Sequence, residues 1–279
     1  MDEIVRDSID LSKFKEYLRK EEKSPVTIEK YIRDVSIFIN FAGEQKITKE
    51  LTVAYKENLL DLGYAIKSIN SMLASLNCLL RFIGCTEARV KSLKQQKQIY
   101  TPVEKELTKE EYMRLLDASK EQEQLNLVIQ TICGTGIRIS ELKYFTVEAV
   151  KTAEVNVLCK GKSRPILVPK KLCKLLLKYA TDRGIKEGSI FVTRSGKNLD
   201  RSNIWTQMKK LCEKAKVNPK KVFPHNLRKL FARTFYGIEK DIAKLSDILG
   251  HSSIETTRIY VMTTGKEHRQ KIERLGLVV

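Results

Sequence analysis

The helical periodicity of this sequence stops between Lys91 and Lys105, where lysine and glutamine dominate. Apolar residues recur at helical spacing on both sides of this stretch, so each side can bury an apolar face of its own. A polar segment without periodicity is typical of an exposed linker. The sequence therefore predicts two domains, residues 1–98 and 107–279, joined by a linker at 99–106.

The first domain shows helical patterns and no strand pattern. Ser24 and Pro25 mark the start of a long helix, because serine caps a helix and proline suits its first position. A second long helix is expected over 66–83, and weaker patterns over 11–18 and 51–55 bring the number to about four. The prediction is a small helical bundle.

The second domain combines helices with one β-hairpin. Two alternating segments, 155–159 and 165–168, flank a turn expected at Lys160-Gly161-Lys162-Ser163. The fold class expected for the whole chain is mainly α with a small β-sheet, a helical bundle followed by an α+β domain. Helices of the second domain are expected over 108–119, 122–133, 170–181 and 200–215, and from Pro224 onward.

The positive charge is concentrated in one quarter of the chain. The net charge is +18, from 52 Lys and Arg against 34 Asp and Glu, and residues 151–221 hold 19 basic and 5 acidic side chains, a net +14. This balance favours a polyanionic partner, either a nucleic acid or an anionic membrane surface. The charged N-terminus and the lack of a long apolar stretch argue against a signal peptide or a membrane span, so we expect a cytoplasmic protein.

Histidine and cysteine are placed very differently in this sequence. The six cysteines form no Cys-x-x-Cys pair and have no histidine nearby, so we expect them to be reduced and to form no metal site. Two of the three histidines lie in dense motifs, His225-Asn226-Leu227-Arg228 and Leu249-Gly250-His251. His225 and Arg228 share one helix face at this spacing, where both side chains can hold one phosphate.

Two further residues complete the set of chemical candidates. Arg138 follows Gly136 at a turn into a helix, and Tyr260 lies nine residues after His251. Taken singly, each candidate has an ordinary interpretation, as a surface arginine, a loop histidine or a packing tyrosine. Their order along the chain is what makes them informative.

That order, Gly-x-Arg-x-Ser-Glu-Leu, a hairpin lysine, His-x-x-Arg, Leu-Gly-His and Tyr, resembles the tyrosine recombinase (phage integrase) family. The spacings of 23 residues from Arg228 to His251 and nine to Tyr260 match the Xer-type members. The resemblance spans about 108–275, and the segment from Ser24 to Tyr31 is similar to the family's SAM-like core-binding domain.

The resemblance implies a role for each residue. Tyr260 would attack the scissile DNA phosphodiester to give a 3′-phosphotyrosyl link, which keeps the bond energy and requires no cofactor. Arg138 and Arg228 would hold the non-bridging oxygens, and His225 and His251 would add donors and assist the tyrosine proton.

Two residues of the resemblance need separate comment. Lys160, directly before Gly161, would be the general acid for the 5′-oxygen, and Lys162 stays open as an alternative because Cys159 replaces the family's first glycine. Glu141 would position Arg138 without touching the substrate.

The partners implied are double-stranded DNA and further copies of the chain, as a tetramer on two duplexes, with a second recombinase as an alternative partner. The C-terminal segment, 263–279, carries apolar residues that would pass to a neighbouring protomer. The residues expected to contact DNA are Lys162, Arg164, Lys170, Arg194, Lys197, Arg201, Lys209 and Lys229.

The biological role leaves two alternatives. Cys159 and Lys229 depart from the Xer pattern, which favours an integrase of a mobile element over an Xer-like resolvase of chromosome or plasmid multimers. A type IB topoisomerase fits the spacings less well. A non-catalytic DNA-binding module would need neither Tyr260 nor Lys160.

Overall fold

The computed structural model describes residues 9–96, 100, 103–159 and 162–277. The chain divides into two compact units, residues 1–97 and 98–279. Helices dominate both units, and one two-stranded antiparallel sheet lies in the second, which confirms the predicted fold class. Among the described residues, no helix combines the length and the apolar character that crossing a membrane requires.

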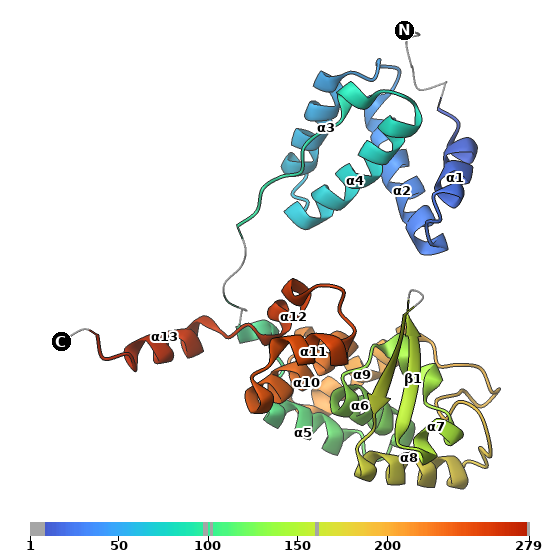
Figure 1. Cartoon of the computed structure of the whole chain (residues 1–279), viewed down its shortest axis with the longest axis vertical. Helices are drawn as coiled ribbons and strands as arrows, with labels where there is room; N and C mark the ends of the chain where they lie inside the picture. Colours follow the sequence, from blue (N-terminus) through green and yellow to red (C-terminus); the bar gives the residue numbers. More distant parts are fainter. Residues whose placement is uncertain (1–8, 97–99, 101–102, 160–161, 278–279) are drawn as a thin grey trace. The chain divides into compact units, whose positions relative to one another are not determined.

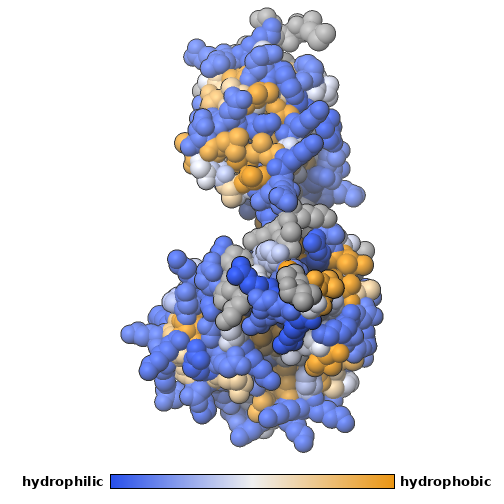
Figure 2. All heavy atoms as spheres, turned by 90° about the vertical axis from the view of Figure 1, so that its left-hand side faces the viewer, coloured by the Kyte–Doolittle hydropathy of each residue, from blue (hydrophilic) through white to orange (hydrophobic). Residues whose placement is uncertain are grey.

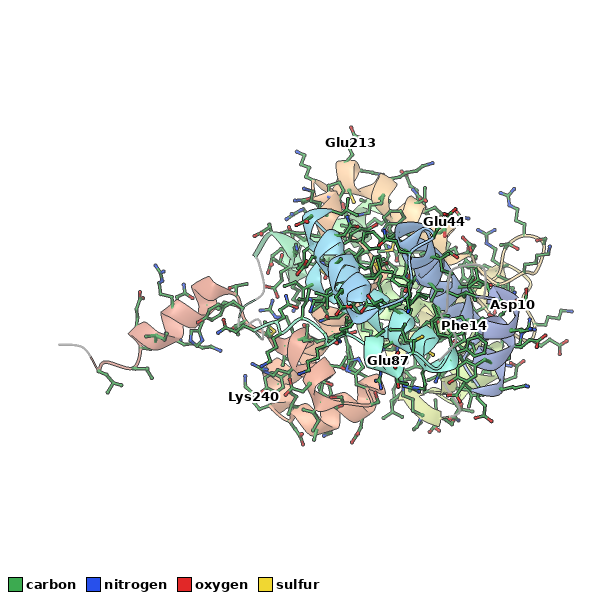
Figure 3. The ribbon with its side chains drawn as sticks, turned by 90° about the horizontal axis from the view of Figure 1, so that it is seen from above. Asp10, Phe14, Glu44, Glu87, Glu213 and Lys240 are labelled. Atoms are coloured by element: carbon green, nitrogen blue, oxygen red, sulfur yellow. The ribbon has the colours of Figure 1, made fainter. Side chains whose placement is uncertain are left out.

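The first unit is a bundle of four α-helices within the described residues. They are α1 (Leu11–Lys20), α2 (Pro25–Ala42), α3 (Lys49–Asp61) and α4 (Ile66–Phe82), shown in blue to cyan in Figure 1. Asp10 and Ser24 cap α1 and α2 by accepting backbone N–H groups, as their residue types favour. Fully buried side chains such as Phe14, labelled in Figure 3, and Phe38 lie in the core that the helices share.

The second unit is built around α6 (Glu123–Thr135), which packs against α10 (Pro224–Glu239). Buried apolar residues occur along α6 from Leu125 to Ile132 and on more than one of its faces, so this helix lies in the middle of the core. A capping box of Thr108 and Glu111 begins α5, as expected from the sequence. The surrounding helices are α5 (Lys109–Ala118), α7 (Val147–Lys151), α8 (Lys170–Asp182) and α9 (Arg201–Ala215).

The hairpin differs from its prediction at the turn. Strand β1 (Glu154–Cys159) pairs with β2 (Lys162–Leu167), and Cys159 lies opposite Lys162. The expected turn included Lys162 and Ser163, but both belong to β2. The prediction was wrong because the ladder continues past Pro165, which can lie within a strand that has a neighbour on one side only.

Three short helices complete the second unit: α11 (Ile242–Leu249), α12 (Ile254–Val261) and α13 (Gly265–Glu273). The first two pack on α10 around a small apolar cluster that includes Tyr260. Near the C-terminal end of the described chain three apolar side chains reach solvent: Ile272, Leu275 and Leu277 are each more than half exposed. Figure 2 shows a mainly hydrophilic face on which apolar patches are scattered.

Candidate active site

The position of Arg138 depends on the left-handed backbone conformation of Gly136, two residues before it. Gly136 ends α6 with φ +66°, and a Cβ at this position would overlap the ring of Phe231 on α10. Only glycine permits both the backbone turn and this close approach of the two helices. Arg138 follows in extended backbone and precedes the short 3₁₀ helix η4 (Ile139–Tyr144), where a regular helix was expected.

One buried carboxylate organises two arginines. Glu141 accepts a hydrogen bond from Arg138 Nη1 at 3.0 Å and another from Arg164 Nη2 at 2.8 Å. Its side chain is 3% exposed, against 33% for Arg138 and 13% for Arg164. Arg164 also donates from Nη1 to the carbonyl of Ile248 at 3.0 Å, so it links β2 to the end of α11.

The turn after α11 lies against these arginines. Gly250 has φ +61°, and a Cβ there would overlap the side chain of Arg164. Its carbonyl accepts from Arg138 Nη2 at 3.0 Å. The Leu-Gly-His motif therefore uses its glycine both for the left-handed turn that ends α11 and for the space that an arginine occupies.

Arg228 is as deeply buried as Glu141, with 2% of its surface exposed. It donates to the carbonyls of Gly136 and Leu249, and its Nη2 lies 3.1 Å from His251 Nε2. Its buried Nε has no partner among the described residues. A buried guanidinium N–H without a partner is costly, so this donor favours an anion.

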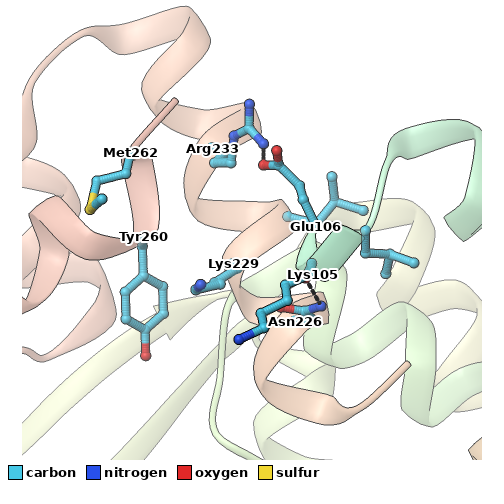
Figure 4. A pocket seen from close by; sticks show the side chains of 9 residues that line it. Lys105, Glu106, Asn226, Lys229, Arg233, Tyr260 and Met262 are labelled. Carbon is cyan, nitrogen blue, oxygen red and sulfur yellow. Dashed lines mark hydrogen bonds and ion pairs between the residues drawn. The ribbon is translucent and has the colours of Figure 1, made fainter. Parts of the chain in front are cut away.

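Two histidine rings flank Tyr260, which is 7% exposed. Its hydroxyl lies 3.3 Å from His225 Nδ1, and the ring centroids of His225 and His251 are 4.9 and 4.8 Å from its own. Figure 4 shows Tyr260 and Lys229 among the residues that line a small cavity beside α10. The tyrosine oxygen, two imidazoles and two guanidinium groups thus come from four separate segments.

The electrostatics of the site follow from burial and crowded positive charge. Burial, followed by repulsion from Arg138, lowers the pKa of Arg228 to about 10. Burial and the nearby Arg228 and Arg138 lower the pKa of His251 to about 4. The pKa of His225 is also lowered, first by loss of water around the ring and then by Lys229. Both histidines are therefore neutral near pH 7 and able to accept a proton.

The predicted general acid lies outside the described residues, as Lys160 falls in the segment 160–161. The side chain of Lys162 is likewise not described, although its backbone pairs within β2. The strands that lead to this segment are joined to the site. Tyr144 donates to the Leu158 carbonyl at 3.2 Å, and Arg164 binds Glu141.

The predicted DNA contacts fall into several places. Arg201 and Lys209, on α9, line a hollow of about 740 Å³ together with Arg138, His225 and Arg228. Lys170, Arg194 and Lys197 are exposed, and Arg194 lines a different hollow that also has acidic residues. Lys229 lines the cavity shown in Figure 4. The side chain of Arg164 binds protein groups, as described above.

Sequence reasoning missed Ser202 and Trp205, which line the same hollow between Arg201 and Lys209. Trp205 is 48% exposed, and Lys209 Nζ lies 5.4 Å from its ring. The signal was present in the sequence, since the chain's single tryptophan lies four residues from a basic residue on each side, at helical spacing. It also missed Thr257, a buried residue whose hydroxyl lies 2.9 Å from His251 Nδ1.

Comparison with known protein families matches both parts of the sequence. Residues 105–267 match the phage integrase family, and residues 11–84 match the phage integrase N-terminal SAM-like domain. Tyrosine recombinase XerA of Pyrococcus furiosus is 30% identical over 276 residues, covering 96% of this chain and 94% of that protein. Tyrosine recombinase XerC of Oceanobacillus iheyensis is 26% identical and covers 91% of each chain.

Solved structures show the same fold. A crystal structure of XerA recombinase is 25% identical with a TM-score of 0.55, covering 96% of this chain and 98% of that one. A lambda integrase tetramer bound to a Holliday junction has a TM-score of 0.74 at 16% identity, covering 93% of this chain and 78% of that one. Because the family match spans more than half of the sequence and one relative aligns over nearly all of it, this chain belongs to the phage integrase family, the tyrosine recombinases.

Proposed function

We propose that this chain cleaves and rejoins DNA at specific sites through a 3′-phosphotyrosyl intermediate on Tyr260. The observation that carries the proposal is the position of the Tyr260 hydroxyl, 3.3 Å from His225 Nδ1 in the same site as two guanidinium groups. The tyrosine oxygen forms a bond to the scissile phosphorus, and the 5′-oxygen leaves. The phosphoester bond energy is retained in the adduct, so no cofactor takes part.

The tyrosine proton passes to His225. This imidazole is neutral near pH 7 because its pKa is lowered, and Nδ1 is the nitrogen within reach of the hydroxyl. A base beside the phenol is needed because the phenolate is the attacking form. The proton that the leaving 5′-oxygen requires comes from Lys160, with Lys162 as the alternative, since both belong to the hairpin whose strands are tied to the site.

Negative charge that develops on the non-bridging oxygens is met by Arg138 and Arg228. Arg228 Nε has no partner among the described residues, and Arg138 lies with one third of its side chain exposed at the hollow lined by Arg201 and Lys209. Fixed donors in a site of low dielectric stabilise a transition state strongly, because they need no reorganisation during the reaction. Glu141 holds Arg138 in place.

Duplex DNA lies along the basic surface near α9, where most of the affinity comes from phosphate contacts and falls with salt. The aromatic face of Trp205 adds a stacking or apolar contact to the sugar or base edges. The reaction takes place in the cytoplasm. Copies of the chain assemble on DNA as a tetramer. Lambda integrase, which has the same fold, forms such a tetramer on a Holliday junction.

The exposed apolar residues beyond α13 carry the assembly contact. Ile272, Leu275 and Leu277 are 53%, 61% and 81% exposed, which leaves an apolar surface for a neighbouring copy. Deletion of residues 266–279 is expected to reduce cooperative binding to paired sites in a gel-shift titration and to preserve binding to a single site. Unchanged cooperativity would contradict this contact.

A nicked suicide DNA substrate tests the chemistry. The wild-type chain is expected to form a covalent adduct without metal ions, visible on a denaturing gel, and Tyr260→Phe is expected to form none. Tyr236→Phe is the matched control, because Tyr236 packs on the same small cluster. An adduct that persists in Tyr260→Phe would refute the mechanism, and the absence of any adduct in the wild type would favour a non-catalytic DNA-binding module.

The biological role has two candidates. Integration of a mobile element stays a prediction from the departures at Cys159 and Lys229. The second candidate, resolution of chromosome or plasmid multimers, is favoured by the nearly full-length alignment with XerA and XerC relatives. Sequencing the DNA around the coding region distinguishes them: flanking attachment-site repeats with an excision gene support integration, and their absence supports resolution.

A further inference from the structure

Thr257 contacts the site but has no part in the chemistry proposed above. It lies in α12, three residues before Tyr260, and its side chain is fully buried. Its Oγ1 is 2.9 Å from Nδ1 of His251, and the other ring nitrogen, Nε2, lies 3.1 Å from Arg228 Nη2. Both nitrogens of this imidazole therefore have a protein partner.

The two partners define where the imidazole proton resides. A guanidinium group only donates, so Arg228 Nη2 donates to His251 Nε2, which must be unprotonated. The ring is neutral near pH 7, and its single proton is then on Nδ1. Thr257 Oγ1 accepts this proton, because a hydroxyl can rotate to act as donor or acceptor.

We propose that Thr257 is a positioning residue that fixes the tautomer and the ring orientation of His251, so that Nε2 accepts from Arg228 and holds this guanidinium group in the site. This inference rests on the proposed function, in which Arg228 meets the negative charge of the phosphate. Without the hydroxyl, Nδ1–H would be buried with no acceptor, and the ring would rotate or move its proton to Nε2. A second group that orients a histidine is a common requirement for its chemistry.

The same hydrogen bond ties His251 to the helix that carries the nucleophile. Thr257 and Tyr260 lie one helical turn apart on α12, and the His251 and Tyr260 ring centroids are 4.8 Å apart. A shift of α12 therefore moves the tyrosine and the histidine together. Thr257 thus aligns the nucleophile with the histidine that holds Arg228.

The test compares substitutions at Thr257 with one at its exposed neighbour Thr256. Thr257→Val removes the hydroxyl and keeps the shape, Thr257→Ser keeps the hydroxyl, and Thr256→Val is the matched control on the same helix. Nitrogen-15 NMR of labelled histidine reads the tautomer directly. The chain has only three histidines, so spectra of His225→Gln and His268→Gln assign the His251 signals.

We expect an Nδ1–H tautomer at His251 in the wild type, Thr257→Ser and Thr256→Val, and a changed or mixed tautomer in Thr257→Val. Single-turnover cleavage of the suicide substrate should fall by about 10- to 100-fold in Thr257→Val, at unchanged DNA affinity, and recover in Thr257→Ser. An unchanged tautomer or an unchanged rate in Thr257→Val would overturn the proposal. If Thr257→Val does not fold, Thr257→Ala serves for the same measurements.

Failure of the proposed function gives a different result. In that case the wild type itself forms no Tyr260-dependent adduct, while the NMR spectra still report which His251 nitrogen carries the proton. A wild-type adduct combined with an Nε2–H tautomer would overturn only the inference about Thr257.

Discussion

The two units of this chain each bury a charged group, and they neutralise it in different ways. In the first unit, Asp34 is 5% exposed and binds Lys30, together with Ser75 Oγ at 2.9 Å. The side chains of its cationic neighbours, Lys30 and Arg33, are 32% and 70% exposed, so water screens them. Among the described residues of the first unit, Asp34 is therefore the one buried charge, and cations at the surface balance it.

In the second unit the balance is reversed. Arg138 and Arg164 both bind the buried carboxylate of Glu141, and the same carboxylate acts electrostatically on the nearby Arg228. Other donors of these three groups bind backbone carbonyls, which carry no net charge. Buried cations in excess are costly, and an incoming phosphate reduces that cost. The comparison shows that the first arrangement stabilises a fold, whereas the second prepares a site for an anion.

Removing the shared carboxylate should have the largest effect. In Glu141→Gln, Arg138 and Arg164 lose their counter-charge while Arg164 stays mostly buried, and we expect the free energy of unfolding to fall by about 3–5 kcal/mol. Chemical denaturation measures it. Phosphate or sulfate should restore part of the lost stability. A loss below about 1 kcal/mol would show that the excess positive charge does not lower the stability of the folded chain.

Gly136→Ala should come next. The new Cβ has to adopt φ +66° and meets the ring of Phe231, which together should cost about 3 kcal/mol and displace the carbonyl that binds Arg228. Gly196→Ala is the matched control, because φ there is +75° but the space is open. It should cost about 1 kcal/mol. Equal losses of stability in the two variants would mean that the close approach of Phe231 to Gly136 adds nothing to the cost.

A smaller effect is expected for Asp34→Asn in the first unit. The amide oxygen still accepts from Ser75, and Lys30 can turn to water, so the free energy of unfolding should fall by about 1–2 kcal/mol. Cleavage of the suicide substrate at saturating DNA should be unchanged. A loss as large as that in Glu141→Gln would remove the distinction between the two units.

The last effect depends on pH. Burial keeps the pKa of His251 near 4 in the folded chain, below its ordinary 6.5, so folding favours the neutral ring. Its contribution to stability is complete above about pH 6.5 and is lost as the pH falls towards 4. The stability difference between the wild type and His251→Gln should therefore shrink over this range, as urea titrations at several pH values would measure. A stability difference that stays constant with pH would contradict the lowered pKa of His251.

Local sequence signals predicted most of the secondary structure. The capping box at Thr108 and the Ser24-Pro25 start begin helices where they were expected. The hairpin turn was placed wrongly, since strand pairing depends on register, and the stretch that contains Lys162 and Pro165 has no clear alternation. The helix expected after Arg138 is a 3₁₀ helix, and Glu141 accepts a hydrogen bond from the Arg138 backbone N–H at its start.

The sequence by itself determined the family, the order of the helices and the residues that can perform the chemistry, because motif spacing and apolar periodicity are properties of the linear chain. Only the tertiary structure decided that Arg164 binds Glu141 and Ile248, that Arg228 is buried, and that Thr257 holds His251. These contacts join residues 6 to 84 positions apart. Whether a basic residue meets solvent, DNA or a carboxylate depends on what the fold brings beside it, and no local pattern records that.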